Sequence, residues 1–378
     1  MDPRVLIVGG SLVGMATALA LDARGVTCRV VERWKPPVRG GTGLGVDRGL
    51  LSRVTGRDAR RSDGGVGLLP VIHAHGEAAA WQDIHDWLCA HVLAAKHINL
   101  VHGVKINRVG TEDDHAWADA EGMRHLARVV VGADGYRSEV RRAVGSGRTH
   151  GRWAGYVLWR GLAKETWLPP ELQGFPDGNG VGRTTTDGYR LIAYPVPGPD
   201  GGTRRCARAI AFAWYDPFRR DDLSRLGCVA GNEVLSSLAA DAMPTKLLHE
   251  LRTLAARVWP LPWREAVVAV IDRGELFGTP IVEHVPERLT HGRLALAGDA
   301  AHVSTPALGG GLETGLLDAE TFADALAESA EGAEEQALAN YELLRLRHGR
   351  AIALRGQAWS EAYVATAHER RLPHCRSL

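Results

Sequence analysis

The stretch VLIVGGSLVGMATALALDARGVTCRVVE, residues 5–32, decides the fold. It begins with the apolar run Val5 to Val8, which is typical of a buried parallel strand. A glycine-containing turn follows, then a helical pattern from Leu12 to Arg24, and then a second strand that ends on Glu32. A strand, a turn, a helix and a strand within about thirty residues indicate the βαβ unit of a dinucleotide-binding fold, which implies a parallel sheet with a right-handed crossover.

The turn GGSLVG resembles the fingerprint G-x-G-x-x-G, with Gly9, Ser11 and Gly14 at its three fixed positions. The middle glycine, which normally lets the backbone approach a pyrophosphate, is replaced by the small residue Ser11. The amides of Leu12 and Val13 still open a helix, whose positive end can hold a diphosphate.

The acid at the end of the second strand completes this unit. Glu32 can accept hydrogen bonds from ribose hydroxyls, and it would repel a phosphate on the ribose. A glycine-rich turn that binds no nucleotide remains the alternative for the whole unit.

The rest of the chain indicates a second region with a different hydrophobic pattern. We predict a loop over 35–49, a helix over 82–95 and an apolar strand ending at Gly132. From Trp153 to Trp214 the alternating, aromatic-rich runs predict an antiparallel sheet.

Further along the chain, Pro244 opens a helix whose apolar stripe is expected in the core: Leu247, Leu248, Leu251, Leu254 and Val258. The apolar runs 264–272 and 292–299 predict two more strands, which return to the first region. An amphipathic helix is expected over 334–364, with its arginines on a solvated face: Arg345, Arg347, Arg350 and Arg355.

Composition narrows the classes of protein. The chain has 378 residues, more than one core usually serves, and its formal net charge of +1 gives no electrostatic footprint for nucleic acid or an anionic membrane. The five cysteines lie far apart, and no apolar run is long enough to span a bilayer. We therefore expect a cytoplasmic protein that binds neither nucleic acid nor membrane, and we leave its oligomeric state open.

A second motif, GADGYRS, occupies Gly132 to Ser138 between the predicted strand and a helix. Asp134 can cap this helix, while Arg137 reaches outward. A simple capped turn is the preferred interpretation of this segment taken alone.

A third motif is GDAAHVSTPALGGGLETGLLDAE, residues 298–320. Asp299 comes directly after an apolar strand, where it can meet the polyol chain of a ligand that lies along the carboxyl edge of the sheet. The glycines Gly309 to Gly311 leave bare amides at the start of a helix beginning near Leu312, which favours an anion. A glycine-rich helix start that serves packing alone remains possible.

Other chemistries lack support in the sequence. The histidines, His302 among them, have no metal-ligand spacing, so we expect no metal and interpret them as surface or core residues. The chain also contains no G-x-S-x-G nucleophile elbow, which argues against an α/β-hydrolase.

Together the three motifs resemble those of the single-component (class A) FAD-dependent aromatic hydroxylases with the para-hydroxybenzoate hydroxylase fold. The matching segments are GGSLVG with VVER, GADGYRS, and GDAAHVSTPALGGGLETGLLDA. The segments YVLWRG, YPVPGPDGG and FAWYDP are similar to the branch that contains dihydroxypyridine hydroxylase.

The resemblance implies an α/β fold with a discontinuous, Rossmann-like FAD-binding domain of the GR2 type (1–70, 80–152 and 273–333). An antiparallel-sheet substrate domain (71–79 and 153–272) is inserted into it, and a C-terminal helical segment (334–378) follows. The implied activity is a monooxygenase that uses NADPH or NADH and O2 to hydroxylate a small aromatic or heteroaromatic substrate through a 4a-hydroperoxyflavin. The cofactor carries this chemistry, so no side chain can be named as the acid or base.

The resemblance also implies roles for individual residues. Leu12, Val13, Glu32 and Arg33 would hold the adenosine-diphosphate half, Asp299 the ribitol, and Gly311 and Leu312 the isoalloxazine, with Pro306 beside the flavin where oxygen reacts. The wider set of cofactor residues adds Gly9, Ser11, Gly14, Val104, Asp134 and Gly309. Asp134, Gly135 and Arg137 would support nicotinamide binding. Candidates for the substrate wall are Tyr194, Trp214 and Tyr215, for which ordinary sheet packing is an equal alternative.

Three positions depart from the family pattern. Trp81 stands where many relatives carry an arginine, Gly310 where glutamine is common, and Glu313 where an uncharged residue is frequent. We infer that Glu313 points away from the flavin ring or is neutral when the flavin is reduced.

Rival functions remain open. A halogenase or a reductase on the same scaffold is one, although VWPLPWREA lacks the halogenase pattern W-x-W-x-I-P. A flavin-binding sensor without turnover is another. A plain NAD-dependent dehydrogenase would explain only the first turn.

Overall fold

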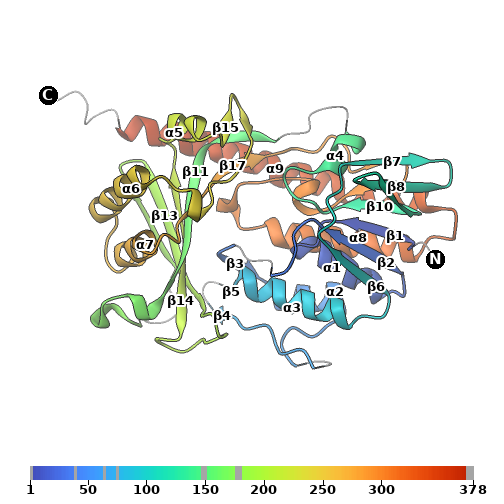
Figure 1. Ribbon diagram of the computed structural model, residues 1–378, viewed down its shortest axis with the longest axis horizontal. Helices are drawn as coiled ribbons and strands as arrows, with labels where there is room; N and C mark the ends of the chain where they lie inside the picture. The colour runs from blue at the N-terminus through green and yellow to red at the C-terminus, as the bar shows by residue number, and fades with distance from the viewer. Residues whose placement is uncertain are drawn as a thin grey trace.

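The computed structural model describes residues 3–37, 41–62, 65–73, 76–145, 151–174 and 181–371. Within them the fold is α/β, as predicted: a mainly parallel sheet occupies one side of the molecule and an antiparallel sheet the other (Figure 1). The long C-terminal helix passes along both sides (Figure 1). The division into domains remains a prediction.

The first sheet has the strand order β18-β19-β10-β1-β2-β6. All its pairings are parallel except that of β18 with β19. The fully buried β1 lies in the middle of the sheet, which explains its unbroken apolar sequence. The strands of this sheet are β1 (Val5–Val8), β2 (Cys28–Glu32), β6 (Ile98–His102), β10 (Val129–Gly132), β18 (Thr290–His291) and β19 (Leu294–Leu296).

Four helices flank this sheet. Helix α1 is buried over almost its whole length and packs between α8 and α3. The short α4 contacts β10 and β19. The helices predicted after the glycine turn, over 82–95 and near Leu312 are thereby confirmed. Their bounds are α1 (Leu12–Asp22), α3 (Trp81–Ala94), α4 (Glu139–Val144) and α8 (Gly311–Ala327).

Two small antiparallel sheets complete this side. The predicted loop over 35–49 is wrong in part, because Gly43–Val46 forms strand β3 and α2 begins at Arg48; residues 38–40 lie outside the described chain. The lack of a side chain at Gly43 admits Tyr194 and Ala211, since an added Cβ would lie 2.7 Å from each. The elements are β3 (Gly43–Val46), α2 (Arg48–Thr55), β4 (Ile72–His73), β5 (Glu77–Ala80), β7 (Arg108–Glu112), β8 (His115–Ala120) and β9 (Met123–Ala127).

The predicted antiparallel sheet is confirmed and has the order β12-β13-β14-β11-β16-β15, with β17 also paired to β11. One of its faces packs against α6 and α7, which lie on the outer side of the molecule (Figure 1). The strands are β11 (Arg152–Lys164), β12 (Gly182–Thr186), β13 (Tyr189–Pro197), β14 (Arg208–Asp216), β15 (Val229–Ala230), β16 (Glu233–Val234) and β17 (Phe277–Glu283).

The helical stripe after Pro244 is confirmed as α6 (Thr245–Val258), with Leu248 only partly buried. The strand predicted over 264–272 is wrong, because these residues belong to helix α7 (Trp263–Asp272). The remaining short helices are α5 (Arg220–Arg225), η1 (Glu165–Trp167), η2 (Pro170–Leu172), η3 (Ala240–Ala242), η4 (Gly298–Ala300) and η5 (Pro306–Leu308).

The C-terminal helix α9 (Glu334–Arg371) is longer than predicted and contacts α8, β11, β17 and β18. Arg347, Arg350 and Arg355 are exposed as expected, but Arg345 is buried. The prediction of a solvated face is wrong for Arg345 because its guanidinium pairs with Asp318 of α8.

Candidate active site

The three motifs meet at one edge of the parallel sheet. The turn GGSLVG follows β1, Asp134 follows β10, Asp299 follows β19, and Glu32 is the last residue of β2. These strands are neighbours and run in the same direction, so their carboxyl ends lie together. The carboxyl edge of such a sheet is where ligands bind in open α/β folds.

The geometry of the first turn explains why Ser11 is tolerated. Gly9 has φ +106°, and a Cβ added there would lie 2.5 Å from the carbonyl oxygen of Ala133. A Cβ on Gly14 would lie 1.9 Å from the carbonyl oxygen of Gly9. Ser11, in contrast, has φ −86° and is exposed, so it needs no glycine. The two glycines that the turn requires are therefore present, and α1 begins with unobstructed amides.

Backbone amides hold Glu32 in place. Its Oε2 accepts a hydrogen bond from Gly10 N–H at 2.7 Å, and its Oε1 accepts one from Trp34 N–H at 2.8 Å. Val104 is tied to the same residue, since its N–H donates to the Glu32 carbonyl at 3.0 Å. The neighbouring Arg33 is exposed, with its guanidinium 5.3 Å from the ring centre of Trp34. Glu32 thus presents an oriented carboxylate beside the helix start.

The second motif is a capped turn in the structure. Asp134 Oδ2 accepts a hydrogen bond from Glu139 N–H of α4 at 2.7 Å, whereas its buried Oδ1 has no hydrogen-bond partner among the described residues. Burial raises the pKa of Asp134 despite these hydrogen bonds. Gly135 has φ +80°, and the exposed Arg137 donates to the Leu235 carbonyl at 2.8 Å. The nicotinamide role of this motif remains a prediction.

Asp299 is exposed at the edge of the sheet, one residue after Gly298. Gly298 has φ +59°, and a Cβ there would lie 2.9 Å from Val13 of α1. The buried Arg141 donates to the carbonyl oxygens of Asp299 at 3.2 Å and of Ala300 at 3.0 Å. Although the side chain is open to solvent, the surrounding protein raises the pKa of Asp299 by desolvation, which outweighs nearby cations. The carboxylate is therefore held at a defined place by its backbone.

In the loop between Asp299 and α8, backbone amides are accessible to a ligand. Pro306 is exposed in η5, and Gly309 has φ +72°. A Cβ added at Gly309 or Gly311 would meet no described atom within 4 Å, so a ligand can approach these amides. In the first turn of α8, Leu312 packs partly against the core, whereas Glu313 is exposed.

A buried ionic network lies beneath this loop, and sequence reasoning missed it. His302 Nε2 is 2.7 Å from Asp318 Oδ2, and Arg345 Nε is 2.8 Å from Asp318 Oδ1. Burial lowers the pKa of His302, but Asp318 outweighs this effect and the net shift is upward. Gly298 N–H also donates to Asp318 at 3.0 Å. His302 is therefore a core histidine, and the signal that was missed is an acid on the apolar face of α8.

The substrate-wall candidates separate in the structure. Tyr194 lies on the sheet face opposite to α6 and α7, and its hydroxyl donates to the Gly43 carbonyl at 2.7 Å. Tyr215 lies on the same face and stacks with Tyr156 at 5.6 Å. Trp214 is on the other face, fully buried, with its ring centre 5.5 Å from that of Trp259. The choice of Trp214 is therefore corrected: alternation along β14 turns it away from the face shared by Tyr194 and Tyr215.

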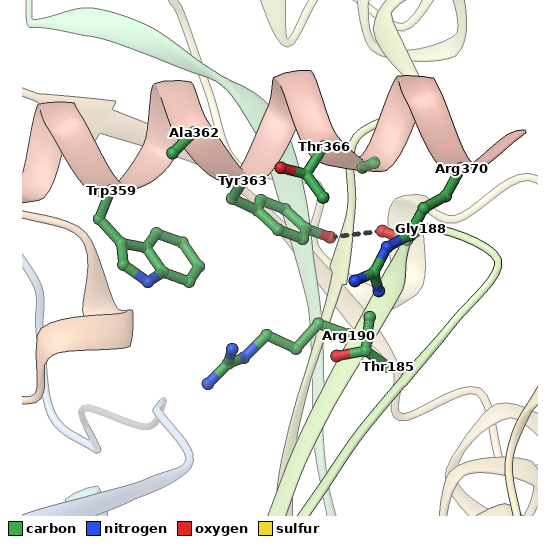
Figure 2. Close-up of a pocket in the computed structure, with 9 residues that line it drawn as sticks. Thr185, Gly188, Arg190, Trp359, Ala362, Tyr363, Thr366 and Arg370 are labelled. Atoms are coloured by element: carbon green, nitrogen blue, oxygen red, sulfur yellow. Dashed lines mark hydrogen bonds between the residues drawn. The ribbon is translucent and has the colours of Figure 1, made fainter.

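Beside this face lies a cavity of about 260 Å³ between α9 and the β12–β13 hairpin (Figure 2). Figure 2 shows Arg190 extending from β13 toward Trp359 of α9; its guanidinium carbon lies 5.5 Å from the centre of that ring. Tyr363 donates a hydrogen bond to the Gly188 carbonyl at 3.1 Å across the same cavity (Figure 2). The cavity thus adjoins the row of aromatic residues that includes Tyr215.

Trp81 begins α3 and stacks on His85 with ring centres 4.9 Å apart. The backbone N–H of Trp81 donates to the Thr42 carbonyl at 2.7 Å, and its side chain fills the space that a side chain at Gly41 would occupy. No group of three or more His, Cys, Asp or Glu in the described chain is placed to hold a metal. Among the described helices, none is long and apolar enough to span a membrane.

The residues at this edge fit FAD. Open amides at the start of α1 suit its diphosphate, the held carboxylates suit its sugar hydroxyls, and the glycines that precede α8 leave room for a ring. The fit follows from the space at this edge and from its accessible hydrogen-bonding groups.

Comparisons with known proteins agree. The family described as FAD binding domain matches residues 2–52 and 271–356, and the family described as FAD binding domain-like matches residues 153–273. Among curated proteins, 2,6-dihydroxypyridine 3-monooxygenase of Paenarthrobacter nicotinovorans is 26% identical, over 92% of this chain and 88% of its own. 3-Amino-4-hydroxybenzoate 2-monooxygenase of Streptomyces cremeus is also 26% identical, over 96% of this chain and 88% of its own.

Solved structures share the fold. 2,6-Dihydroxypyridine-3-hydroxylase from Arthrobacter nicotinovorans superposes with a TM-score of 0.78 at 22% identity and covers 96% of this chain and 92% of its own. HpxO of Klebsiella pneumoniae, solved with FAD and uric acid, superposes with a TM-score of 0.70 at 20% identity and covers 97% and 92%.

Fold and site together define a flavoprotein monooxygenase, with FAD as its cofactor and NADPH or NADH as its reductant. In sequence and fold the chain is similar to the class A FAD-dependent aromatic hydroxylases.

Proposed function

We propose that the protein hydroxylates a small aromatic or heteroaromatic compound, bound between the carboxyl edge of the parallel sheet and the face of the antiparallel sheet that carries Tyr194 and Tyr215. The observation that carries this proposal is the meeting of the three motifs at one edge, with Asp299 exposed and the glycines before α8 open. The relatives named for dihydroxypyridine and aminohydroxybenzoate support a ring that bears electron-donating groups.

Each part of the edge has a task in this proposal. Amides at the start of α1 bind the diphosphate, Glu32 binds a ribose, and Asp299 orients the ribitol. Amides from Gly309 to Gly311 at the positive end of α8 stabilise negative charge on the pyrimidine side of the ring. Bound FAD supplies the redox chemistry with NAD(P)H and oxygen, while Pro306 and the second sheet keep water from the reacting atoms.

The first test is a spectrum and a turnover assay. Purified protein, reconstituted with FAD, should be yellow, and the right aromatic compound should accelerate its oxidation of NADPH or NADH. Labelled O2 should place one labelled atom in the product. A product without label would favour a reductase or halogenase, and a protein that cannot hold FAD would overturn the proposal.

Asp299→Asn tests the cofactor site. The change removes a charged acceptor, so we expect the affinity for FAD to fall by about tenfold or more, as measured by flavin fluorescence titration. Asp272→Asn is a matched control, because Asp272 is exposed and pairs with Arg252 far from the motifs along the chain. Equal affinities in both variants would remove Asp299 from the site.

A further inference from the structure

The arginine Arg160 on β11 has no assigned task, and its side chain projects from the face that carries Tyr194 and Tyr215. Side chains alternate along a strand, so Arg160 shares its face with Leu158 and Leu162. Leu158 packs in the cluster of Tyr215, and Leu162 packs beside Tyr194. Arg160 therefore stands between two apolar clusters.

Small residues lie next to Arg160 across the sheet. It is paired with Ala213 of β14, which is paired in turn with Ile192 of β13. The next row along the same face has Leu162, Ala211 and Tyr194. The alanines of β14 leave space beside Arg160 on that side, whereas Phe277 of β17 is its neighbour on the other side.

Arg160 is half-buried, and its side chain has no partner among the described residues. Its Nε is inaccessible to solvent and makes no hydrogen bond, and the side chain forms no ion pair with any residue in the described ranges. Burial lowers the pKa of Arg160, while Tyr215, Tyr194, Tyr156 and Asp299 act in the opposite direction. A partly desolvated cation without a counter-ion is unfavourable, so a bound anion would relieve a penalty that the described residues leave in place.

Three considerations direct this anion to the substrate. The open amides at the start of α1 and at the start of α8 would serve the anionic parts of FAD. Arg190, two strands away on the same face, rests over the ring of Trp359, whereas Arg160 has no such support (Figure 2 shows Arg190). Arg160 shares its sheet face with Tyr194, which bonds to Gly43 of β3, so the guanidinium lies on the side of the parallel sheet rather than of α6 and α7.

We propose that Arg160 anchors an anionic oxygen of the substrate, either a ring carboxylate or an ionised ring hydroxyl, and so selects acidic aromatic compounds. This inference rests on the proposed function and specifies its substrate class. A planar guanidinium with several donors matches a carboxylate in two-point contact and a phenolate in one-point contact.

Binding titrations of the FAD-loaded protein test the proposal without turnover. The probes are two matched pairs followed by flavin absorbance at pH 8: benzoate against benzamide, and 4-nitrophenol against 4-nitroanisole. Wild type should bind at least one anion more tightly than its neutral partner, and the pair that shows the preference identifies the anionic group. In Arg160→Met the affinity for that anion should fall by about 10- to 100-fold, with the neutral partner little changed. Arg160→Lys should recover part of the preference.

The control is Arg225→Met, which removes the same charge from an exposed arginine paired with Asp222. It should leave the preference intact. A wild type without any preference for the anions, or an Arg160→Met variant that keeps it, would overturn the proposal. Loss of FAD affinity in Arg160→Met with the preference retained would instead assign Arg160 to the flavin. A protein that shows the anion preference but no oxygen incorporation would contradict the proposed function alone.

Discussion

At the scale of single residues, the site depends on positions where a side chain would not fit. Gly9 and Gly14 are required by contacts to backbone carbonyls, whereas Ser11 meets no such limit. The fingerprint could be predicted from the sequence because its glycines have a local cause. The partner of a buried arginine could not be predicted from the sequence, because Arg141 and Arg345 bond to residues in other segments of the chain.

The burial of His284 predicts that the folded protein loses stability in acid. Burial, together with Arg141 and His302, lowers its pKa from 6.5 to about 4. Above pH 6.5 the residue is neutral in both states; between 6.5 and about 4 only the unfolded chain takes up a proton, so the folded state loses stability as pH falls. His284→Gln should flatten the decrease in the free energy of unfolding across this interval, as measured by urea denaturation at several pH values.

The exposed His291→Gln is the matched control for this experiment. It should leave the slope as in the wild type. A slope that changes equally in both variants, or in neither, would show that His284 does not resist protonation in the folded protein.

At the scale of elements, pattern predicted most strands and helices but failed where a short apolar run was ambiguous. Residues 264–272 look like a buried strand because Val267, Val268, Val270 and Ile271 are β-branched. In the structure the buried positions Ala266, Val267, Val270 and Ile271 have helical spacing and face the sheet. Packing against the antiparallel sheet decided between two secondary structures that the local sequence allows equally.

The contact of α1 with α8 yields a second prediction. A Cβ on Gly315 would lie 2.5 Å from Val13 Cγ2. Gly315→Ala should gain about 1 kcal/mol of helix propensity but lose about 1–3 kcal/mol to overpacking, so we expect a net destabilisation measurable by thermal unfolding. The double variant Val13→Ala with Gly315→Ala should recover stability relative to the sum of the single changes. Additive effects would show that the two helices do not meet as described.

At the scale of the whole molecule, α9 connects the two sides. Near its start, Tyr341 donates to the Leu296 carbonyl of β19 at 2.7 Å. Near its end, Tyr363 donates to the carbonyls of Gly188 and Tyr215 at 3.1 and 3.0 Å. The helix thereby sets the antiparallel sheet against the edge where the motifs meet, and its length of 38 residues serves this span.

Arg345 tests this role of α9. Arg345→Met leaves the buried Asp318 with His302 but without its second cation, so we expect the free energy of unfolding to fall by about 3 kcal/mol. Urea denaturation measures the change. Arg347→Met, on the exposed side of the same helix, should cost much less. Similar decreases in the free energy of unfolding of the two variants would show that the buried network does not stabilise the fold.

The sequence by itself determined the βαβ unit, the carboxyl-edge motifs and the antiparallel region, because hydrophobic period, glycine turns and helix starts act over a few neighbouring residues. Only the tertiary structure decided which face each side chain meets. It turned Trp214 away from Tyr215, buried Arg345 against Asp318, and left Arg160, between two apolar clusters, without a counter-ion among the described residues. The physical reason is that burial and charge pairing depend on contacts between segments far apart in the chain, which no local pattern contains.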